Sequence, residues 1–207
     1  IAGSFMINQT RKMEENGQLE ILNSLHIGSQ ASSMATNLLV LLHTVLTIIL
    51  VSGILVSYNV SSIDLKGSLY FACSLGLASL LGASIAYLCA QIFATSSQAR
   101  GIFFSIVGIL YVLRAGTDVS NLILSKFNPL AWTYLGYPFY QNDWYYLIGL
   151  FLLTLVVFSI GLVLESSRDL GSSTIAPKKG KTKASKWLAT PLGFFFYLNR
   201  STIISWL

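Results

Sequence analysis

Residues 37–58 read NLLVLLHTVLTIILVSGILVSY, and this stretch decides the fold class. It contains no Asp, Glu, Lys or Arg, and none of these occurs anywhere from residue 31 to residue 63. A helix needs about 20 consecutive apolar residues to cross the hydrocarbon core of a bilayer. Within lipid, a helix satisfies all of its backbone hydrogen bonds inside one segment. The stretch therefore predicts a membrane-spanning helix.

Two further uncharged runs lie at residues 67–99 and 144–164. Only 10% of the 207 residues are charged and 54% are hydrophobic, whereas soluble domains carry roughly 25% charged residues. This composition excludes a soluble globular domain and a disordered chain. Another span is expected from residue 101, although Arg114 follows after only 13 uncharged residues. We predict an all-α, polytopic helical membrane protein with a bundle of four spans at residues 37–164.

The basic residues divide unevenly between the two sides that four spans create. With residues 9–36 in the cytoplasm, ten Lys and Arg fall on the cytoplasmic side and three fall outside. Cytoplasmic loops carry an excess of Lys and Arg, so residues 94–100 and 165–200 are also expected inside. The net charge of +5 is then mostly a signal of topology. No nucleic-acid partner is expected, because such binding needs basic side chains and aromatic platforms on a folded surface.

Both ends of the chain have the pattern of further membrane helices. Residues 1–8 (IAGSFMIN) are typical of the last turns of a preceding helix, and residues 201–207 (STIISWL) of the first turns of another. Before the second of these, residues 165–200 form a basic linker. Such segments attract anionic lipid, but the interpretation favoured here is a signal of topology. We therefore expect an internal piece of a longer, multi-pass protein of the cell membrane.

Residues 10–28 (TRKMEENGQLEILNSLHIG) mix charged and apolar side chains densely. The apolar residues can share one side of a helix, with a break or bend expected at Gly17. An amphipathic helix between two spans can float in the membrane interface, cap the bundle or dock onto a soluble partner. Interfacial helices favour Lys and Arg, whereas this segment has three acids and two bases. The balance favours docking onto another protein.

Residues 114–143 (RAGTDVSNLILSKFNPLAWTYLGYPFYQND) are expected outside but are too apolar for a simple solvated loop. The pattern predicts a short helix that stops before Pro129, followed by a crowd of aromatic side chains. Two interpretations stay open. The segment is either a re-entrant or interfacial element over the mouth of a pathway, or an ordinary aromatic belt at the membrane surface.

The chain lacks the motifs that would give it chemistry of its own. It has no GxxxxGK[ST] phosphate-binding loop, no HExxH and no GxSxG. The spans contain no Asp, Glu, Lys or Arg, which disfavours a proton- or sodium-coupled carrier. We expect no catalytic residue, no metal site and no cofactor on this chain. A transport role would need a motor that docks from the cytoplasm.

Three segments, taken in order, carry a resemblance to a known family. They are residues 11–22 (RKMEENGQLEIL), residues 128–144 (NPLAWTYLGYPFYQNDW), and residues 167–171 (SRDLG) with residues 191–206 (PLGFFFYLNRSTIISW). The first resembles the cytoplasmic coupling segment of ABC-2 type transporter permeases, and the second resembles the external segment between their fifth and sixth helices. The third resembles the junction between the two halves of the long permeases of polyketide-antibiotic exporters, the tetronasin-resistance type.

The resemblance implies a fold and a set of partners. The fold is the six-helix transmembrane half of an ABC-2 exporter, of which this chain covers about helices three to six. The partners are a nucleotide-binding ATPase, which would hold ATP and Mg, the second transmembrane half of the same chain, and the lipid bilayer. The implied function is export of a hydrophobic or amphipathic, antibiotic-like compound across a bacterial plasma membrane.

The resemblance also implies roles for particular residues. Those expected to couple the chain to the ATPase are Arg11, Glu14, Glu15, Gly17 and Glu20, with the three acids contacting basic groups on the ATPase. The candidates for an external gate are Pro129, Trp132, Pro138 and Trp144. The motif at the junction of the halves is Arg168, Asp169, Leu170 and Gly171.

Two alternative functions stay open. An intramembrane enzyme acting on lipids or peptides would need two convergent polar groups at one depth, for instance His43 and a serine of the span at residues 68–93. A non-transporting membrane scaffold would use residues 10–28 only to recruit a soluble partner.

Overall fold

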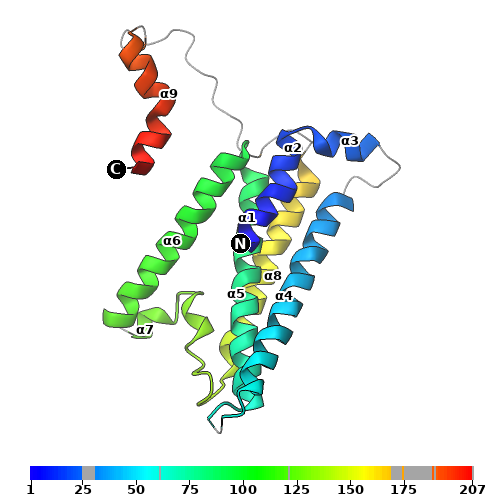
Figure 1. Cartoon of the computed structure of the whole chain (residues 1–207), viewed down its shortest axis with the longest axis vertical. Helices are drawn as coiled ribbons and strands as arrows, with labels where there is room; N and C mark the ends of the chain where they lie inside the picture. Colours follow the sequence, from blue (N-terminus) through cyan, green and yellow to red (C-terminus); the bar gives the residue numbers. More distant parts are fainter. Residues whose placement is uncertain are drawn as a thin grey trace. The chain divides into compact units, whose positions relative to one another are not determined.

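The computed structural model of the chain describes residues 1–24, 31–60, 62–120, 122–168, 174, 188 and 190–206. It divides into two compact units, Ile1–Ala176 and Pro177–Leu207. The first unit holds the helical bundle (Figure 1). The second contains α9 (Pro191–Trp206), whose first turn is capped by the Thr190 hydroxyl accepting from the Gly193 N–H at 3.2 Å.

Long helices dominate the first unit. They are α4 (Ala31–Ser57), α5 (Leu65–Ile92), α6 (Ser96–Ser120) and α8 (Trp144–Ser167). Each is long and apolar enough to cross a membrane, and the described residues contain no strand. The all-α fold class is confirmed, and the chain is a polytopic helical membrane protein.

Short elements precede the first of these helices and connect α6 to α8. At the N-terminal side they are α1 (Ala2–Ile7), a π-helix (Asn8–Lys12), α2 (Met13–Glu15) and α3 (Gln18–Ser24). Between α6 and α8 they are α7 (Leu122–Ser125) and a 3-10 turn (Ala131–Thr133). As predicted, α7 ends before Pro129.

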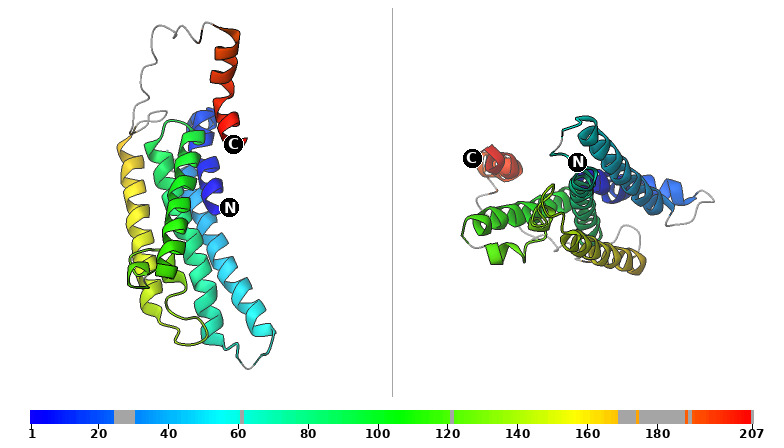
Figure 2. Two further views of the ribbon diagram at one scale, coloured as in Figure 1. Left: turned by 90° about the vertical axis from the view of Figure 1, so that its left-hand side faces the viewer. Right: turned by 90° about the horizontal axis from the view of Figure 1, so that it is seen from below.

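α5 is the central helix of the bundle. It contacts α1, α4, α6 and α8 (Figure 2), and 44% of its most apolar stretch is buried, against 17% for α4, 6% for α6 and 22% for α8. Its small residues allow this close packing. A Cβ added at Gly76 would lie 2.8 Å from the Ile48 side chain. The outer faces of α4, α6 and α8 carry exposed Leu, Ile, Val and Phe side chains, which suits contact with lipid tails.

α6 is longer than its uncharged run predicts. A span ending at Arg114 was expected, but the helix continues to Ser120. The Arg114 guanidinium lies 4.4 Å from the centre of the Tyr134 ring, and its Nε is 3.6 Å from Asp118 Oδ2 one turn further along. Because the charge is paired with Asp118 in the helix and with the Tyr134 ring beyond it, the helix does not have to end there. Residues 114–120, which were expected in the loop, therefore belong to α6.

The connecting segments gather at two opposite ends of the bundle. Residues 8–24, the α5–α6 connection and the end of α8 lie at one end, whereas the α4–α5 connection and residues 122–143 lie at the other (Figure 1). This grouping is the one that alternating spans require. Which end faces the cytoplasm stays a prediction.

Candidate functional site

The amphipathic segment is a series of short helices rather than one continuous helix. α1 widens into the π-helix at Asn8–Lys12, α2 follows, and the chain turns at Gly17 before α3. Gly17 has a φ of +72°, the left-handed conformation that ends helices and favours glycine. The predicted break at Gly17 is confirmed. Short π-helical segments within α-helices often occur at functional sites.

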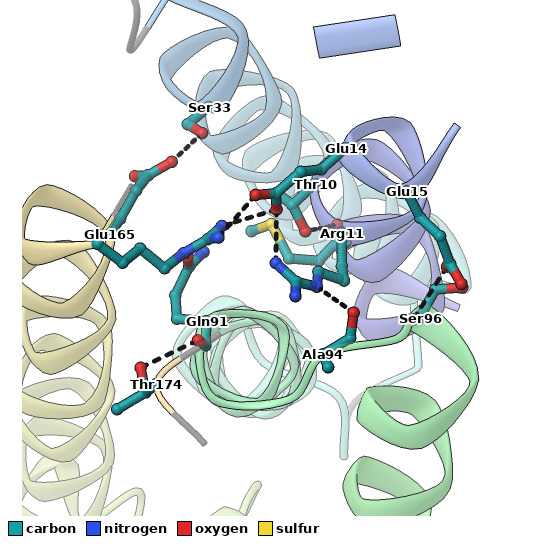
Figure 3. A network of polar contacts seen from close by, with 12 residues as sticks. Thr10, Arg11, Glu14, Glu15, Ser33, Gln91, Ala94, Ser96, Glu165 and Thr174 are labelled. Atoms are coloured by element: carbon teal, nitrogen blue, oxygen red, sulfur yellow. Dashed lines mark hydrogen bonds and ion pairs between the residues drawn. The ribbon is translucent and has the colours of Figure 1, made fainter. Parts of the chain in front are cut away.

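Glu14 lies at the centre of a buried ionic cluster (Figure 3). Its Oε1 accepts from Arg168 Nη1 at 2.7 Å, and its Oε2 accepts from Arg168 Nη2 at 2.9 Å and from Arg11 Nη1 at 2.8 Å. The side chains of Arg11, Glu14 and Arg168 are only 3%, 5% and 12% exposed. One carboxylate is thus shared by two guanidinium groups, which is how a buried charge avoids being left unpaired.

The two arginines extend this cluster to the ends of other helices. Arg168 Nε donates to Gln91 Oε1 at 2.6 Å, and Gln91 is buried near the end of α5. Arg11 Nε donates to the Ala94 carbonyl at 3.0 Å, in the connection between α5 and α6. We call the contacts of residues 8–15 with the ends of α5, α6 and α8 the polar joint. It satisfies a carbonyl just beyond the C-terminus of α5, where no backbone partner within the helix is available.

The polar joint also reaches the first turn of α6. Glu15 Oε2 accepts from the Ser96 backbone N–H at 3.1 Å and from Ser96 Oγ at 2.5 Å. These hydrogen bonds from Ser96 lower the pKa of Glu15 below its usual range, and the charges of Arg11 and Lys12 act in the same direction. A carboxylate is well placed at a helix N-terminus, where backbone N–H groups lack partners. Asn8 Oδ1 accepts from Arg100 Nη2 at 2.7 Å, further along α6.

A second carboxylate joins α8 to α4 and α5. Glu165 accepts a hydrogen bond from the Tyr87 hydroxyl. It accepts another from the Ser33 hydroxyl (Figure 3). Neither Glu165 nor Gln91 is among the site residues that the sequence predicts. The available signal was a long polar side chain at the end of an apolar helix, a position where it must find a partner.

The predicted coupling residues are only partly brought together. Arg11, Glu14 and Glu15 belong to the polar joint, with Arg168 from the junction motif. Glu20 lies on α3 and is exposed, as is Glu15. The Glu14 carboxylate binds guanidinium groups of its own chain, whereas Glu15 and Glu20 are exposed. The contacts of all three acids with an ATPase stay predictions. Asp169, Leu170 and Gly171 lie outside the described residues.

The candidates for an external gate lie at the opposite end of the bundle. Trp132 Nε1 donates to the Lys126 carbonyl at 2.7 Å, and the Trp144 ring packs edge-on against Tyr70 of α5 at 5.5 Å between ring centres. Pro129 follows Asn128, which donates to the Leu110 carbonyl of α6 at 2.8 Å. These contacts attach the segment to α5 and α6, and its two functional interpretations both stay open.

Pro138 lies in a tight turn of the same segment. The residues on either side, Tyr137 and Phe139, have φ values of +49° and +65°, a conformation that costs free energy outside glycine. The turn is held by the Phe139 N–H donating to Asn142 Oδ1 at 2.9 Å and by the Asp143 N–H donating to the Gly136 carbonyl at 2.9 Å. Asp143 then caps the start of α8, accepting from the Tyr145 N–H at 3.1 Å.

The interior also contains an apolar cavity of about 230 Å³ between α1, α4, α5 and α8. The residues that line it include Met6, Asn37, Val40, Ala83 and Phe158. His43 lies on α4 with an exposed side chain, and among the described residues no hydrogen bond joins it to a serine of α5. The described residues also contain no group of three or more His, Cys, Asp or Glu side chains that could hold a metal ion.

Fold and site together define a polytopic membrane protein whose helices are connected at one end by a buried polar joint. No family model matches the chain. It is 26% identical, over 203 residues and 97% of its length, to the multidrug efflux system permease protein Rv1217c of Mycobacterium tuberculosis. The chain spans about a third of the length of that curated relative, 36%. The similarity thus extends over nearly the whole chain and is to a membrane permease.

Proposed function

We propose that the chain is part of the membrane permease of an ABC-2 type exporter that moves hydrophobic or amphipathic, drug-like compounds out of the cell. The observation that carries the proposal is the similarity, over 97% of the chain, to a permease named for multidrug efflux. The four apolar helices supply the spans that such a subunit needs. The same similarity favours a transport subunit over an intramembrane enzyme.

The energy would come from a separate ATPase subunit that binds ATP and Mg. The chain itself has no phosphate-binding loop. The docking element would be α2 and α3, which present the exposed acids Glu15 and Glu20 and the apolar Ile21, whose side chain is 67% exposed. An exposed apolar side chain beside charges is a common composition for a protein interface. The docking element would face the cytoplasm, as the distribution of Lys and Arg predicts.

The finer identity follows from the resemblance of three ordered segments. The chain would be helices three to six of the first half of a long permease, of the type that exports polyketide antibiotics. The substrate path would run between this half and a second half of the same chain, in a bacterial plasma membrane. Arg168 and the residues after it would then mark the junction of the halves.

The docking step is tested with the full-length permease co-expressed with its ATPase. Glu20→Lys reverses an exposed charge on α3, and we expect it to lower ATPase co-purification by about tenfold, because like charges across an interface repel. ATP-dependent efflux of an amphipathic dye from proteoliposomes should fall in parallel. Lys66→Glu is the matched control, since Lys66 is equally exposed but lies at the other end of the bundle.

Two results would overturn the proposal. Unchanged co-purification and efflux in Glu20→Lys would remove α3 as the docking element. Co-purification of an active ATPase with the unaltered permease, but no ATP-dependent movement of any tested amphiphile, would indicate a scaffold rather than an exporter.

A further inference from the structure

We propose that Arg168 is a positioning residue that couples residues 8–15 to α8, so that a displacement of the docking element moves α5 and α8 with it. The inference rests on the proposed function, because it assigns a path for the displacement that the ATPase would produce. It goes beyond the resemblance, which marks Arg168 only as part of a junction between two halves.

The backbone position of Arg168 suits this role. Arg168 is the C-cap of α8, with a φ of −110° and a ψ of 148°, so the chain leaves the helix at this residue. Its side chain is therefore carried directly by the end of α8. The carboxylate that it binds belongs to Glu14, 154 residues earlier in the chain.

The guanidinium group of Arg168 connects three elements at once. Nη1 and Nη2 hold both oxygens of Glu14 on α2, and Nε holds the side chain of Gln91 on α5. Such a planar, two-point contact resists rotation as well as separation, and a lysine ammonium cannot reproduce it. Because Arg168 is 12% exposed and Glu14 is 5% exposed, solvent screens the pair only weakly.

The contacts of Arg11 should keep residues 8–15 folded when Arg168 is replaced, so that the coupling role of Arg168 can be tested by itself. Without Arg168, the Glu14 carboxylate would still be paired with Arg11 at 2.8 Å, and Arg11 would still bind the Ala94 carbonyl. The segment would therefore remain attached to the α5–α6 connection. What it would lose is the link that Arg168 makes between Glu14 and the end of α8.

Glu165 supplies a matched control on the same helix end. It binds Tyr87 of α5 and Ser33 of α4, and so holds α8 within the bundle through α4 and α5. Glu165→Gln removes a carboxylate from α8 at a comparable depth. A general loosening of α8 would affect both variants, whereas loss of coupling should be specific to Arg168.

The experiment uses the full-length permease with its ATPase in proteoliposomes. The measured quantity is the number of dye molecules transported per ATP hydrolysed, in Arg168→Gln, Arg168→Lys, Glu14→Gln, the Glu14→Gln/Arg168→Gln double variant and Glu165→Gln. We expect Arg168→Gln to lower this ratio by about fivefold or more with ATPase co-purification unchanged. Arg168→Lys should recover part of the ratio. The double variant should be little worse than the more affected single variant, since both remove one interaction.

A second readout reports the attachment without any transport. Spin labels at Lys12→Cys and Ser166→Cys, both exposed positions, in a background without Cys73 and Cys89, give the distribution of distances between residues 8–15 and the end of α8. Arg168→Gln should broaden this distribution and Glu165→Gln should not. An unchanged distribution, or a broadened one with an unchanged transport ratio, overturns the inference. If the unaltered permease transports nothing, the proposed function fails, while the spin-label distances still decide whether Arg168 attaches the segment.

Discussion

Individual residues decide how closely α5 and α8 approach each other. A Cβ added at Gly161 of α8 would lie 2.6 Å from the Tyr87 ring, which is fully buried. The same tyrosine donates its hydroxyl proton to a hydrogen bond with Glu165. The absent side chain at Gly161 therefore makes room for a ring that both fills the core and fixes a carboxylate. Gly82 of α5, in contrast, has nothing within 4 Å of an added Cβ.

These two glycines make a matched prediction. Gly161→Ala should destabilise the protein by about 1–2 kcal/mol, because the Tyr87 ring must move in a packed core. Gly82→Ala should be neutral or stabilising by up to about 1 kcal/mol, because alanine is the better helix former. The thermal midpoint of the detergent-purified protein measures both. Equal midpoints for the two variants would contradict the packing seen at Gly161.

At the scale of elements, the start of α6 depends on a residue outside it. Glu15 of α2 accepts two hydrogen bonds from Ser96, the first residue of α6. The first N–H groups of a helix have no hydrogen-bond acceptor within that helix. Glu15 of α2 supplies such an acceptor to α6, and this contact joins the two helices. The π-helix at Asn8–Lys12 and the turn at Gly17 place α2 where this contact forms.

The contact between α2 and α6 predicts a dependence of stability on pH. The hydrogen bonds from Ser96 lower the pKa of Glu15 in the folded protein. The ionised Glu15 side chain therefore stabilises the folded protein fully above the unfolded pKa of about 4.3. This stabilisation is lost as the pH falls through the lower pKa of the folded state. The thermal midpoint of Glu15→Gln should lie below that of the unaltered protein at pH 7, with the gap closing toward pH 3.

Glu20→Gln is the control for this prediction, because it removes an acid of the same segment without removing a bond to Ser96. A gap between Glu15→Gln and the unaltered protein that stays constant from pH 7 to pH 3 would show that the effect is not due to the charge of Glu15.

For the whole molecule, the arrangement of the segments defines two sides. Residues 8–24 with the ends of α5 and α8 lie at one end, and α7 with the aromatic segment lies at the other. A lipid bilayer would surround the exposed apolar faces of α4, α6 and α8 between them. The polar joint then lies at the boundary between the bilayer and the side on which a motor would bind.

The orientation is tested with two lysines of opposite ends, Lys12 and Lys126, both exposed. In a background without Cys73 and Cys89, a membrane-impermeant maleimide should label Lys126→Cys in intact cells. It should label Lys12→Cys only after the cells are permeabilised, because the excess of Lys and Arg marks the cytoplasmic side. The opposite pattern would reverse the topology and remove the proposed docking side.

Most of the fold could be predicted because its cause is local. An uncharged run of about 20 residues has few alternatives to a spanning helix, and α4, α5 and α8 lie where three such runs predict them. The end of α6 could not be predicted, because the partners of Arg114 include Tyr134 beyond the helix. The break at Gly17 was predictable because it depends on one residue's backbone preference.

Amino-acid sequence by itself determined the helical membrane class and the approximate spans, whereas the roles it suggests for Arg11, Glu14 and Arg168 stay predictions. Only the tertiary structure decided that Arg168 binds both Glu14 and Gln91, and that Glu165 accepts hydrogen bonds from Tyr87 and Ser33. The physical reason is separation along the chain. Hydrophobicity and helix breaking act over one or two turns, whereas a buried carboxylate takes whichever donors the folded helices bring to it, here from 154 residues away.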